Sequence, residues 1–141
     1  MRKSVLFLIG IIFIVSVVVV TFFGMKVTVD QFKVYINKVE ITTYDRIIRD
    51  RKYKTVELDE TEGYTSLFIE YNLGPDNATE LDGIVFTISG NTYIDENGEE
   101  QISAEISPTG ELVFYRAARV TVTIRTTDGS EMSDSVLVSC V

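Results

Sequence analysis

The stretch VTVTIRTTDGSEMSDSVLVSC, residues 120–140, carries the alternation that decides the fold. Apolar residues occupy every second position from Val120 to Ile124 and again from Val136 to Cys140, and polar residues take most positions between them. A period of two is typical of a strand that buries one face. Asp128-Gly129 lies between the two runs and is a strong hairpin turn signal. The sequence therefore predicts a half-buried β-hairpin at this end of the chain.

Shorter runs of the same kind precede this hairpin, and turn residues separate them. One run changes phase at residues 37–38, which predicts a bulge or a strand that crosses between sheets, because a shift of one residue reverses the buried face. The expected turns are 59–63, 74–77, 95–98 and 107–110. The runs are Phe32–Ile36 with Val39 and Ile41, then Tyr53–Leu58, Leu67–Leu73, Ile84–Ile88, Ile102–Ile106 and Leu112–Phe114.

These signals predict an all-β fold, an immunoglobulin-like sandwich of about seven strands, preceded by one N-terminal transmembrane helix. The chain has no tryptophan and a single cysteine, which excludes the antibody-type core. We expect Phe86 to be the large central residue instead. Cys140 has no partner within the chain, so it is either a small buried strand residue, which we favour, or the site of an intermolecular disulfide.

The N-terminal segment VLFLIGIIFIVSVVVVTFF, residues 5–23, contains no charged side chain and directly follows Arg2 and Lys3. A helix that spans a bilayer needs about 20 such residues. Two interpretations compete, a cleaved signal peptide and an uncleaved signal anchor. We favour the anchor because the apolar core is long and no A-x-A pattern follows it. The positive-inside bias then predicts a single-pass plasma-membrane protein with a cytoplasmic N-terminus and an extracytoplasmic C-terminal domain.

The expected organisation has four segments. These are a short cytoplasmic tip (1–4), the transmembrane signal anchor (5–24), a linker (25–31) and the β-sandwich domain (32–141). Once Arg2 and Lys3 are set aside, 11 basic and 21 acidic residues remain, a net charge of −10. Nucleic-acid binding needs a net basic surface, so we expect no nucleic-acid partner. The absence of histidine excludes triads and zinc sites that use it.

Several phrases in order resemble the bacterial immunoglobulin-like domains of group 2, which are related to the repeats of invasin and intimin. The resemblance implies an immunoglobulin-like fold used for spacing or for binding at surfaces, with no catalytic residues. Phe86 stands where the family has a tryptophan, and the hairpin around 95–101 is longer than usual. The phrases are VEIT (39–42), YNLGPDNAT (71–79), IVFTISG (84–90), AEISPTGELVF (104–114), VTVTIRTTDGS (120–130) and SVLVSC (135–140).

A basic run, RIIRDRKYK at 46–54, stands out on the acidic domain. Arginine binds phosphate through a bidentate fork, so one hypothesis is contact with a polyanion, such as a phosphate-rich wall polymer or anionic headgroups, or with a partner. The alternative is a solvated loop or an edge strand whose charges prevent edge-to-edge pairing. The candidate contact residues are Arg46, Arg49, Arg51, Lys52 and Lys54.

Two acidic clusters, at 57–62 and 95–100, supply the oxygen ligands that calcium prefers, but their spacing is not that of an EF-hand. We therefore commit to no metal site and no cofactor. Asn77-Ala78-Thr79 matches an N-glycosylation sequon, with a plain turn as the alternative. A glycan-cleaving pair such as Glu99 and Glu105 is the weakest hypothesis, because no spacing argues for it.

The predicted function is a non-enzymatic, membrane-anchored interaction or structural module that acts close to the membrane. One strand of about six residues spans roughly 20 Å, so a single domain has a short reach. We expect another protein or a cell-wall component as the partner. The alternatives are a small accessory subunit of a larger membrane complex and, less favoured, a binder of surface polysaccharide or wall polymer.

Overall fold

The computed structural model describes residues 2–30 and 33–141, and for residues 24–30 it describes the backbone alone. The chain divides into two compact units, Met1–Lys33 and Val34–Val141.

The first unit is one helix, α1 (Lys3–Asp30). Its segment Lys3–Phe23 includes 18 consecutive residues with a mean hydropathy of 3.2 and is the one described helix long and apolar enough to cross a membrane. At 1.5 Å per residue, such a span is roughly 30 Å long, about the thickness of a hydrocarbon core. The hydroxyls of Ser16 and Thr21 donate to the carbonyls of Ile12 and Val17, which satisfies them within the helix.

The helix continues beyond residue 24, where the sequence predicts that the transmembrane segment ends. Residues 25–30, expected to be part of a linker, are helical, and residue 31 lies outside the described residues. The segment MKVTVD contains no proline and no further glycine, so no helix-breaking residue ends α1 at Gly24.

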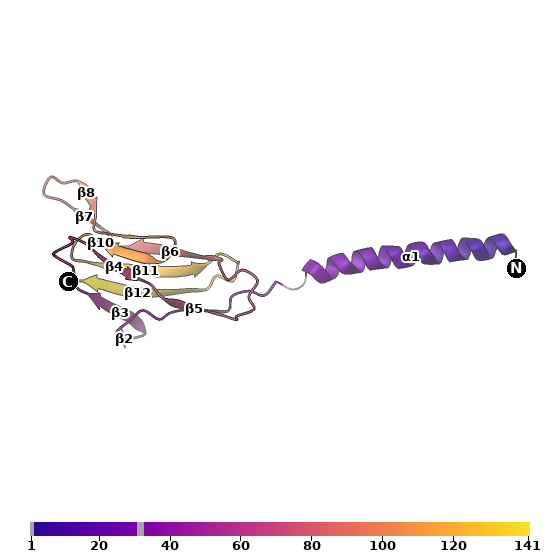
Figure 1. Cartoon of the computed structure of the whole chain (residues 1–141), viewed down its shortest axis with the longest axis horizontal. Helices are drawn as coiled ribbons and strands as arrows, with labels where there is room; N and C mark the ends of the chain where they lie inside the picture. The colour runs from indigo at the N-terminus through magenta and orange to yellow at the C-terminus, as the bar shows by residue number, and fades with distance from the viewer. Residues whose placement is uncertain (1, 31–32) are drawn as a thin grey trace. The chain divides into compact units, whose positions relative to one another are not determined.

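The second unit is a β-sandwich whose larger layer has five strands in the order β2-β3-β12-β11-β6 (Figure 1). Neighbouring strands are antiparallel, except that β3 and β12 are parallel. The early strand β3 therefore lies directly beside the last strand of the chain. The strands of this layer are β2 (Arg46–Ile48), β3 (Arg51–Val56), β6 (Ile84–Ser89), β11 (Ala118–Thr126) and β12 (Ser133–Cys140).

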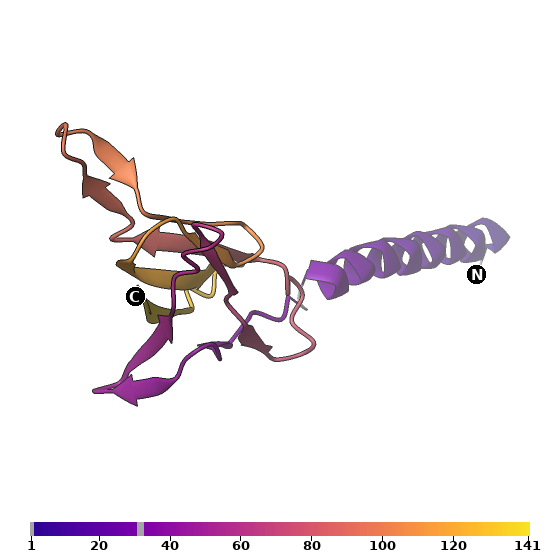
Figure 2. The same ribbon diagram turned by 60° about the vertical axis from the view of Figure 1, so that its left-hand side comes forward.

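Smaller sheets make up the rest of the unit. A three-stranded sheet has the order β4-β10-β9, and β1 pairs with β5. The β7–β8 hairpin stands away from the sandwich, as Figures 1 and 2 both show. These strands are β1 (Lys38–Ile41), β4 (Thr65–Phe68), β5 (Tyr71–Gly74), β7 (Thr92–Ile94), β8 (Glu100–Ile102), β9 (Ala104–Ile106) and β10 (Glu111–Phe114).

The core lies between the layers and consists of the apolar phases that the sequence indicates. Phe114 and Leu112 are fully buried, and Phe86 is 8% exposed, with its ring edge-on to Tyr71 at 5.6 Å. Cys140 is a buried, free thiol, as expected of a small strand residue, and burial raises its pKa. The core residues are Ile41, Ile69, Phe86, Ala104, Leu112, Phe114, Val120, Val122, Ile124, Val136, Val138 and Cys140.

The all-β character, the N-terminal helix and the alternating runs are confirmed, whereas the strand count is wrong. The described residues form twelve strands instead of about seven. The predicted run Leu67–Leu73 is two strands, because β4 pairs with β10 whereas β5 pairs with β1. Ile102–Ile106 is likewise divided between β8 and β9. A strand that moves between sheets must break its ladder, and the local pattern does not show this.

The segment before β1 differs from a regular strand. Phe32 lies outside the described residues, and residues 33–37 have no strand geometry. Hydrogen bonds to distant residues secure the stretch, among them one from the Val34 amide to Thr79 Oγ1 and one from the Ile36 amide to Asp128 Oδ2 at 2.7 Å. The prediction of a bulge or a sheet crossing at residues 37–38 is therefore wrong, because residues 33–37 are not a strand and β1 begins only at Lys38.

Candidate functional site

The basic run forms the β2–β3 hairpin at one edge of the five-stranded sheet. Arg49 and Asp50 make its two-residue turn, with φ of 50° and 62°. Positive φ at both positions is the geometry of the turns that join tightly paired antiparallel strands. The hairpin also exposes Ile47 and Ile48. The predicted residues are therefore close in space, but they do not all point the same way.

Two of the predicted cations are already paired with carboxylates. Lys52 forms an ion pair with Asp134 and also donates to the Ile41 carbonyl at 2.7 Å. Lys54 pairs with Asp45 at 2.7 Å, and this contact is the main cause of the lowered pKa of Asp45. Both lysines occupy the phase of β3 that faces the core side, opposite Val136 and Val138. These ion pairs stabilise the hairpin. Because the charges of the two lysines are already paired, the lysines are less available to bind a polyanion.

Arg46 and Arg51 occupy the other phase, which faces away from the core. Arg46 pairs in register with Tyr53, and Tyr53 with Leu137 of β12. We call the solvent side of the five-stranded sheet the outer face; it consists of the strand residues that alternate with the core positions. Arg46 and Arg51 therefore belong to a larger surface than the hairpin itself.

The outer face contains hydroxyl side chains in register across up to three neighbouring strands. Thr123 lies between Thr87 of β6 and Ser135 of β12, and Thr121 lies between Ser89 and Leu137. Arg119 of β11 lies beside Ser139 and donates from Nε to its Oγ at 3.2 Å. A hollow of about 370 Å³ on this face has Arg51, Thr121, Ser135 and Leu137 in its lining.

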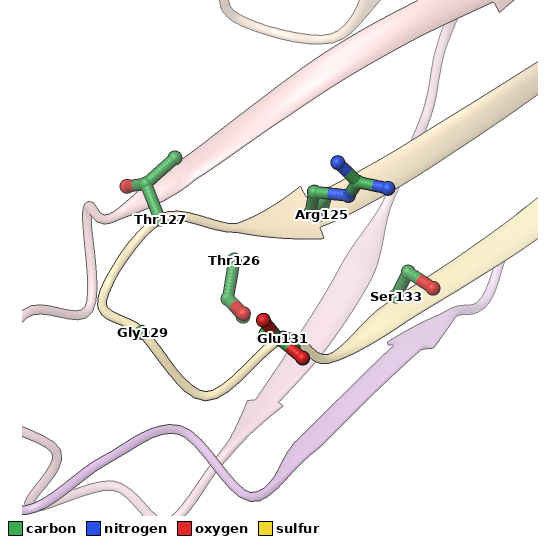
Figure 3. Close-up of a pocket in the computed structure, with 6 residues that line it drawn as sticks. All are labelled: Arg125, Thr126, Thr127, Gly129, Glu131 and Ser133. Atoms are coloured by element: carbon green, nitrogen blue, oxygen red, sulfur yellow. The ribbon is translucent and has the colours of Figure 1, made fainter.

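A second hollow lies where β11 and β12 meet their connecting loop, at the Arg125 end of the outer face. Figure 3 shows Arg125 and Ser133 on the two strands, with Gly129 and Glu131 in the loop. The buried Asp128 shapes this loop, since its Oδ1 accepts bonds from the amide and the hydroxyl of Ser130. The lining mixes a guanidinium, a carboxylate and hydroxyls, so this end of the face is polar.

Sequence reasoning missed Arg119 and Arg125 as site candidates. Both are more than 60 residues away from the basic run, and only the pairing of β3 with β12 and of β12 with β11 brings them to the same face. A signal was nevertheless present, because both residues occupy the polar phase of the strand whose apolar phase is the clearest in the chain.

The acidic clusters are mainly turn-forming. Asp95 accepts bonds from the amides of Glu99 and Asn97, each at 2.9 Å, and these bonds lower its pKa, the Glu99 bond most strongly. Asp59 likewise accepts from the amides of Thr61 and Glu62, and its pKa is lowered for that reason. Within residues 2–30 and 33–141, no cluster of three potential metal-ligating side chains is present.

The remaining polar candidates are dispersed. Glu99 belongs to the β7–β8 turn, whereas Glu105 lies on β9 and accepts a bond from the Tyr115 hydroxyl at 2.9 Å. Asn77 is exposed in the turn after β5, where the Ala78 amide bonds back to the Pro75 carbonyl. Asn77 therefore lies in a turn, which is the alternative to a glycosylation site that the sequence offers.

Comparison with known proteins gives little further guidance. No family model matches the chain, and neither does any curated protein. Among solved structures, the chain aligns with Bacteroides ovatus SGBP-B, from the mixed-linkage glucan utilization locus, in complex with a mixed-linkage heptasaccharide. The TM-score is 0.42 and the identity 13%, over 74% of this chain and 24% of that chain. This chain thus spans about a quarter of that protein. A likeness this weak carries no argument about fold type or ligand.

Proposed function

We propose that the chain is a non-enzymatic interaction module, tethered to the outer side of the plasma membrane by an uncleaved α1. The observation that carries the proposal is the combination of two features in one chain. One is a 21-residue apolar helical segment with none of its residues buried, and the other is a separate β-sandwich with its own core. An apolar surface of that size is stable in a bilayer, whereas the acidic sandwich is stable in water.

The domain is proposed to be of the immunoglobulin-like type, resembling group 2 of the bacterial domains. Two layers that enclose one core, with Phe86 among the core residues, support this assignment. The proposed orientation, with the N-terminus in the cytoplasm, is supported by Arg2 and Lys3 ahead of the apolar segment.

Two exposed hairpins supply the surfaces expected of an interaction module. On β2, Ile47 is 52% exposed, and on β7, Ile94 is 66% exposed. Apolar side chains on edge strands are unfavourable unless a partner covers them or nearby charges protect the edge. In the β7–β8 hairpin, the Arg116 guanidinium stacks on Tyr93 of β7, with 3.9 Å between its Cζ and the ring centroid. This contact stabilises the hairpin below its tip. These two hairpins are the edges that a partner is proposed to contact.

The test is in-cell photo-crosslinking of the full chain, with the photoreactive residue placed at Ile94, at Ile47 or, as a control, at Leu81. Leu81 is 43% exposed but lies in a turn outside any strand. We expect a discrete adduct from at least one hairpin position, in the membrane fraction, and none from the control. A protein released from the membrane by cleavage after residue 24, or equal adducts from all three positions, would overturn the proposal.

The same experiment distinguishes a free-standing interaction module from the alternative, a small accessory subunit of a larger membrane complex. A single membrane protein as the crosslinked partner, together with loss of this chain when that partner is deleted, favours the subunit. A stable chain that crosslinks only to itself or to wall fragments favours a free-standing binder.

A further inference from the structure

The outer face of the five-stranded sheet is basic, although the unit that contains it is strongly acidic. Residues Val34–Val141 hold nine basic and twenty acidic residues, a net charge of −11. Four of the nine basic residues, Arg46, Arg51, Arg119 and Arg125, occupy the outer face. All four are exposed arginines.

The strand residues of this face include no carboxylate. Asp134 of β12 is on the core-facing phase, opposite Ile124, and its charge is paired with that of Lys52; both residues also line the hollow beside Arg51. Two carboxylates, Asp50 and Glu131, lie in turns at the rim of the face. The other strand carboxylates of the unit, Glu40, Glu100, Glu105 and Glu111, belong to β1, β8, β9 and β10, outside the five-stranded sheet.

The arginines surround a floor of hydroxyl groups. Arg119 and Arg125 are six residues apart on β11, a separation of roughly 20 Å at 3.3 Å per residue. Arg46 is on β2, three strands away from β11, which is roughly 14 Å at the usual strand spacing. The hydroxyl residues of the floor are Thr55, Thr87, Ser89, Thr121, Thr123, Ser133, Ser135 and Ser139.

A small apolar surface lies among these hydroxyl residues. Tyr53 of β3 and Leu137 of β12 are direct neighbours in the ladder, and both are half-buried. Leu137 also lines the hollow that contains Arg51 and Thr121. The face thus combines separated positive charges, many groups that both donate and accept hydrogen bonds, and a small apolar surface beside an aromatic ring.

We infer that the outer face binds an anionic polysaccharide laid along the sheet. The guanidinium groups bind its phosphate or carboxylate groups, the hydroxyl rows exchange hydrogen bonds with its sugar hydroxyls, and Tyr53 with Leu137 packs against the C–H face of a ring. Arginine suits this role because its planar fork matches both anions. The inference rests on the proposed function, since it names the ligand class of the tethered module.

Charge and shape favour a linear glycan over other polyanions. A broad anionic membrane surface would also approach the acidic remainder of the unit, which repels it, whereas a chain one residue wide meets the basic face alone. Serine and threonine hydroxyls match sugar hydroxyls in number and in dual donor–acceptor capacity. An anion without hydroxyls would leave most of the floor without partners from the ligand.

The test uses the full chain in nanodiscs of zwitterionic phosphatidylcholine and measures binding at low salt to soluble polygalacturonate, a linear polysaccharide with one carboxylate on each sugar ring. We expect saturable binding that weakens at least about tenfold between 50 and 500 mM salt, because several charge contacts are screened. The double variant Arg119→Gln, Arg125→Gln is expected to bind at least about tenfold more weakly. Neutral dextran and inorganic polyphosphate of matched charge serve as comparison probes and are expected to bind more weakly than the sugar polymer.

The matched control is the double variant Lys38→Gln, Arg116→Gln, which also removes two positive charges but outside the outer face: Lys38 lies on β1, and Arg116 lies in the loop before β11, where it stacks on Tyr93. It is expected to bind like the wild type. Failure of the wild type to bind the polymer, an equal loss in the control, or equal binding of polyphosphate would each overturn the inference. Unchanged melting temperatures of all variants would show that the substitutions alter the outer face and leave the folding of the domain intact. If binding fails while the photo-crosslinked adducts persist, the tethered module stands and only the ligand class is wrong.

Discussion

The two faces of the five-stranded sheet are made by the same strands and have opposite chemistry. On β11, Val122 and Ile124 are 0% exposed and contact the core, whereas the intervening Thr123 and the following Arg125 belong to the outer face. A period of two assigns adjacent residues to different environments. The difference teaches that stability and binding can be altered separately at neighbouring positions of one strand.

The strongest test of this separation compares Ile124→Ala with Thr123→Ala. We expect Ile124→Ala to lower the free energy of unfolding by about 2–5 kcal/mol, because it removes buried methyl groups and leaves a cavity. Thr123→Ala is expected to change it by about 0.5 kcal/mol or less, as for most surface substitutions. Urea unfolding of the full chain in detergent, followed by tyrosine fluorescence, measures both. Equal losses would contradict the division into two faces.

A second test concerns the layer that faces the sheet, where Gly110 approaches Phe86. At Gly110 φ is +89°, and an added Cβ would lie 2.9 Å from Phe86 Cζ. Gly110→Ala is expected to cost about 2–4 kcal/mol, the sum of left-handed strain and overpacking.

Gly98→Ala is the matched control for that substitution. Its φ is +82°, but an added Cβ meets nothing within 4 Å. It should cost only the backbone strain, about 1 kcal/mol. The difference between the two variants, measured by thermal melting, isolates the contact with the ring. If both cost the same, Gly110 is required for its φ alone and not for its approach to Phe86.

Local patterns in the sequence were sufficient for the strands that remain in one sheet. The alternation at 84–88 and 120–140 predicted β6, β11 and β12 with their buried residues, and the turns at 95–98 and 107–110 join strands as expected. Each of these features depends on residues close together in the chain, so a short window contains the whole signal.

Features that depend on distant pairing were not predictable in the same way. The break between β4 and β5 and the parallel pairing of β3 with β12 follow from which strands become neighbours. The site shows the same limit. The basic run was visible in the sequence, but its lysines are paired with Asp45 and Asp134, and Arg119 and Arg125 share a face with it only through the ladder.

An intermediate effect is expected at the boundary between the two faces, where Lys52 pairs with Asp134. Their side chains are 14% and 23% exposed, and Asp134 Oδ2 also accepts the Ile41 amide at 2.7 Å. Asp134→Asn should cost about 1–3 kcal/mol, because Lys52 loses its counter-charge in a partly buried place. Asp45→Asn, at the more exposed Lys54 pair, should cost less. A larger loss at Asp45 in urea unfolding would show that exposure does not rank these pairs.

The smallest effect is expected at the tip of the β7–β8 hairpin, where the partly exposed carboxylate of Asp95 orders a turn. The Glu99 amide, followed by that of Asn97, holds the pKa of Asp95 below its ordinary value of 3.8. A lowered pKa means that the stabilisation is fully present above the ordinary value and is lost as the pH falls through the folded one. The tip should therefore stay ordered at pH 5 and loosen below about pH 3.8, while the core remains folded. The amide shifts of Asn97 and Glu99, followed by NMR, should titrate with a midpoint below 3.8. Asp95→Asn should abolish that step, and a midpoint at or above 3.8 would mean that these amides do not stabilise the charged form.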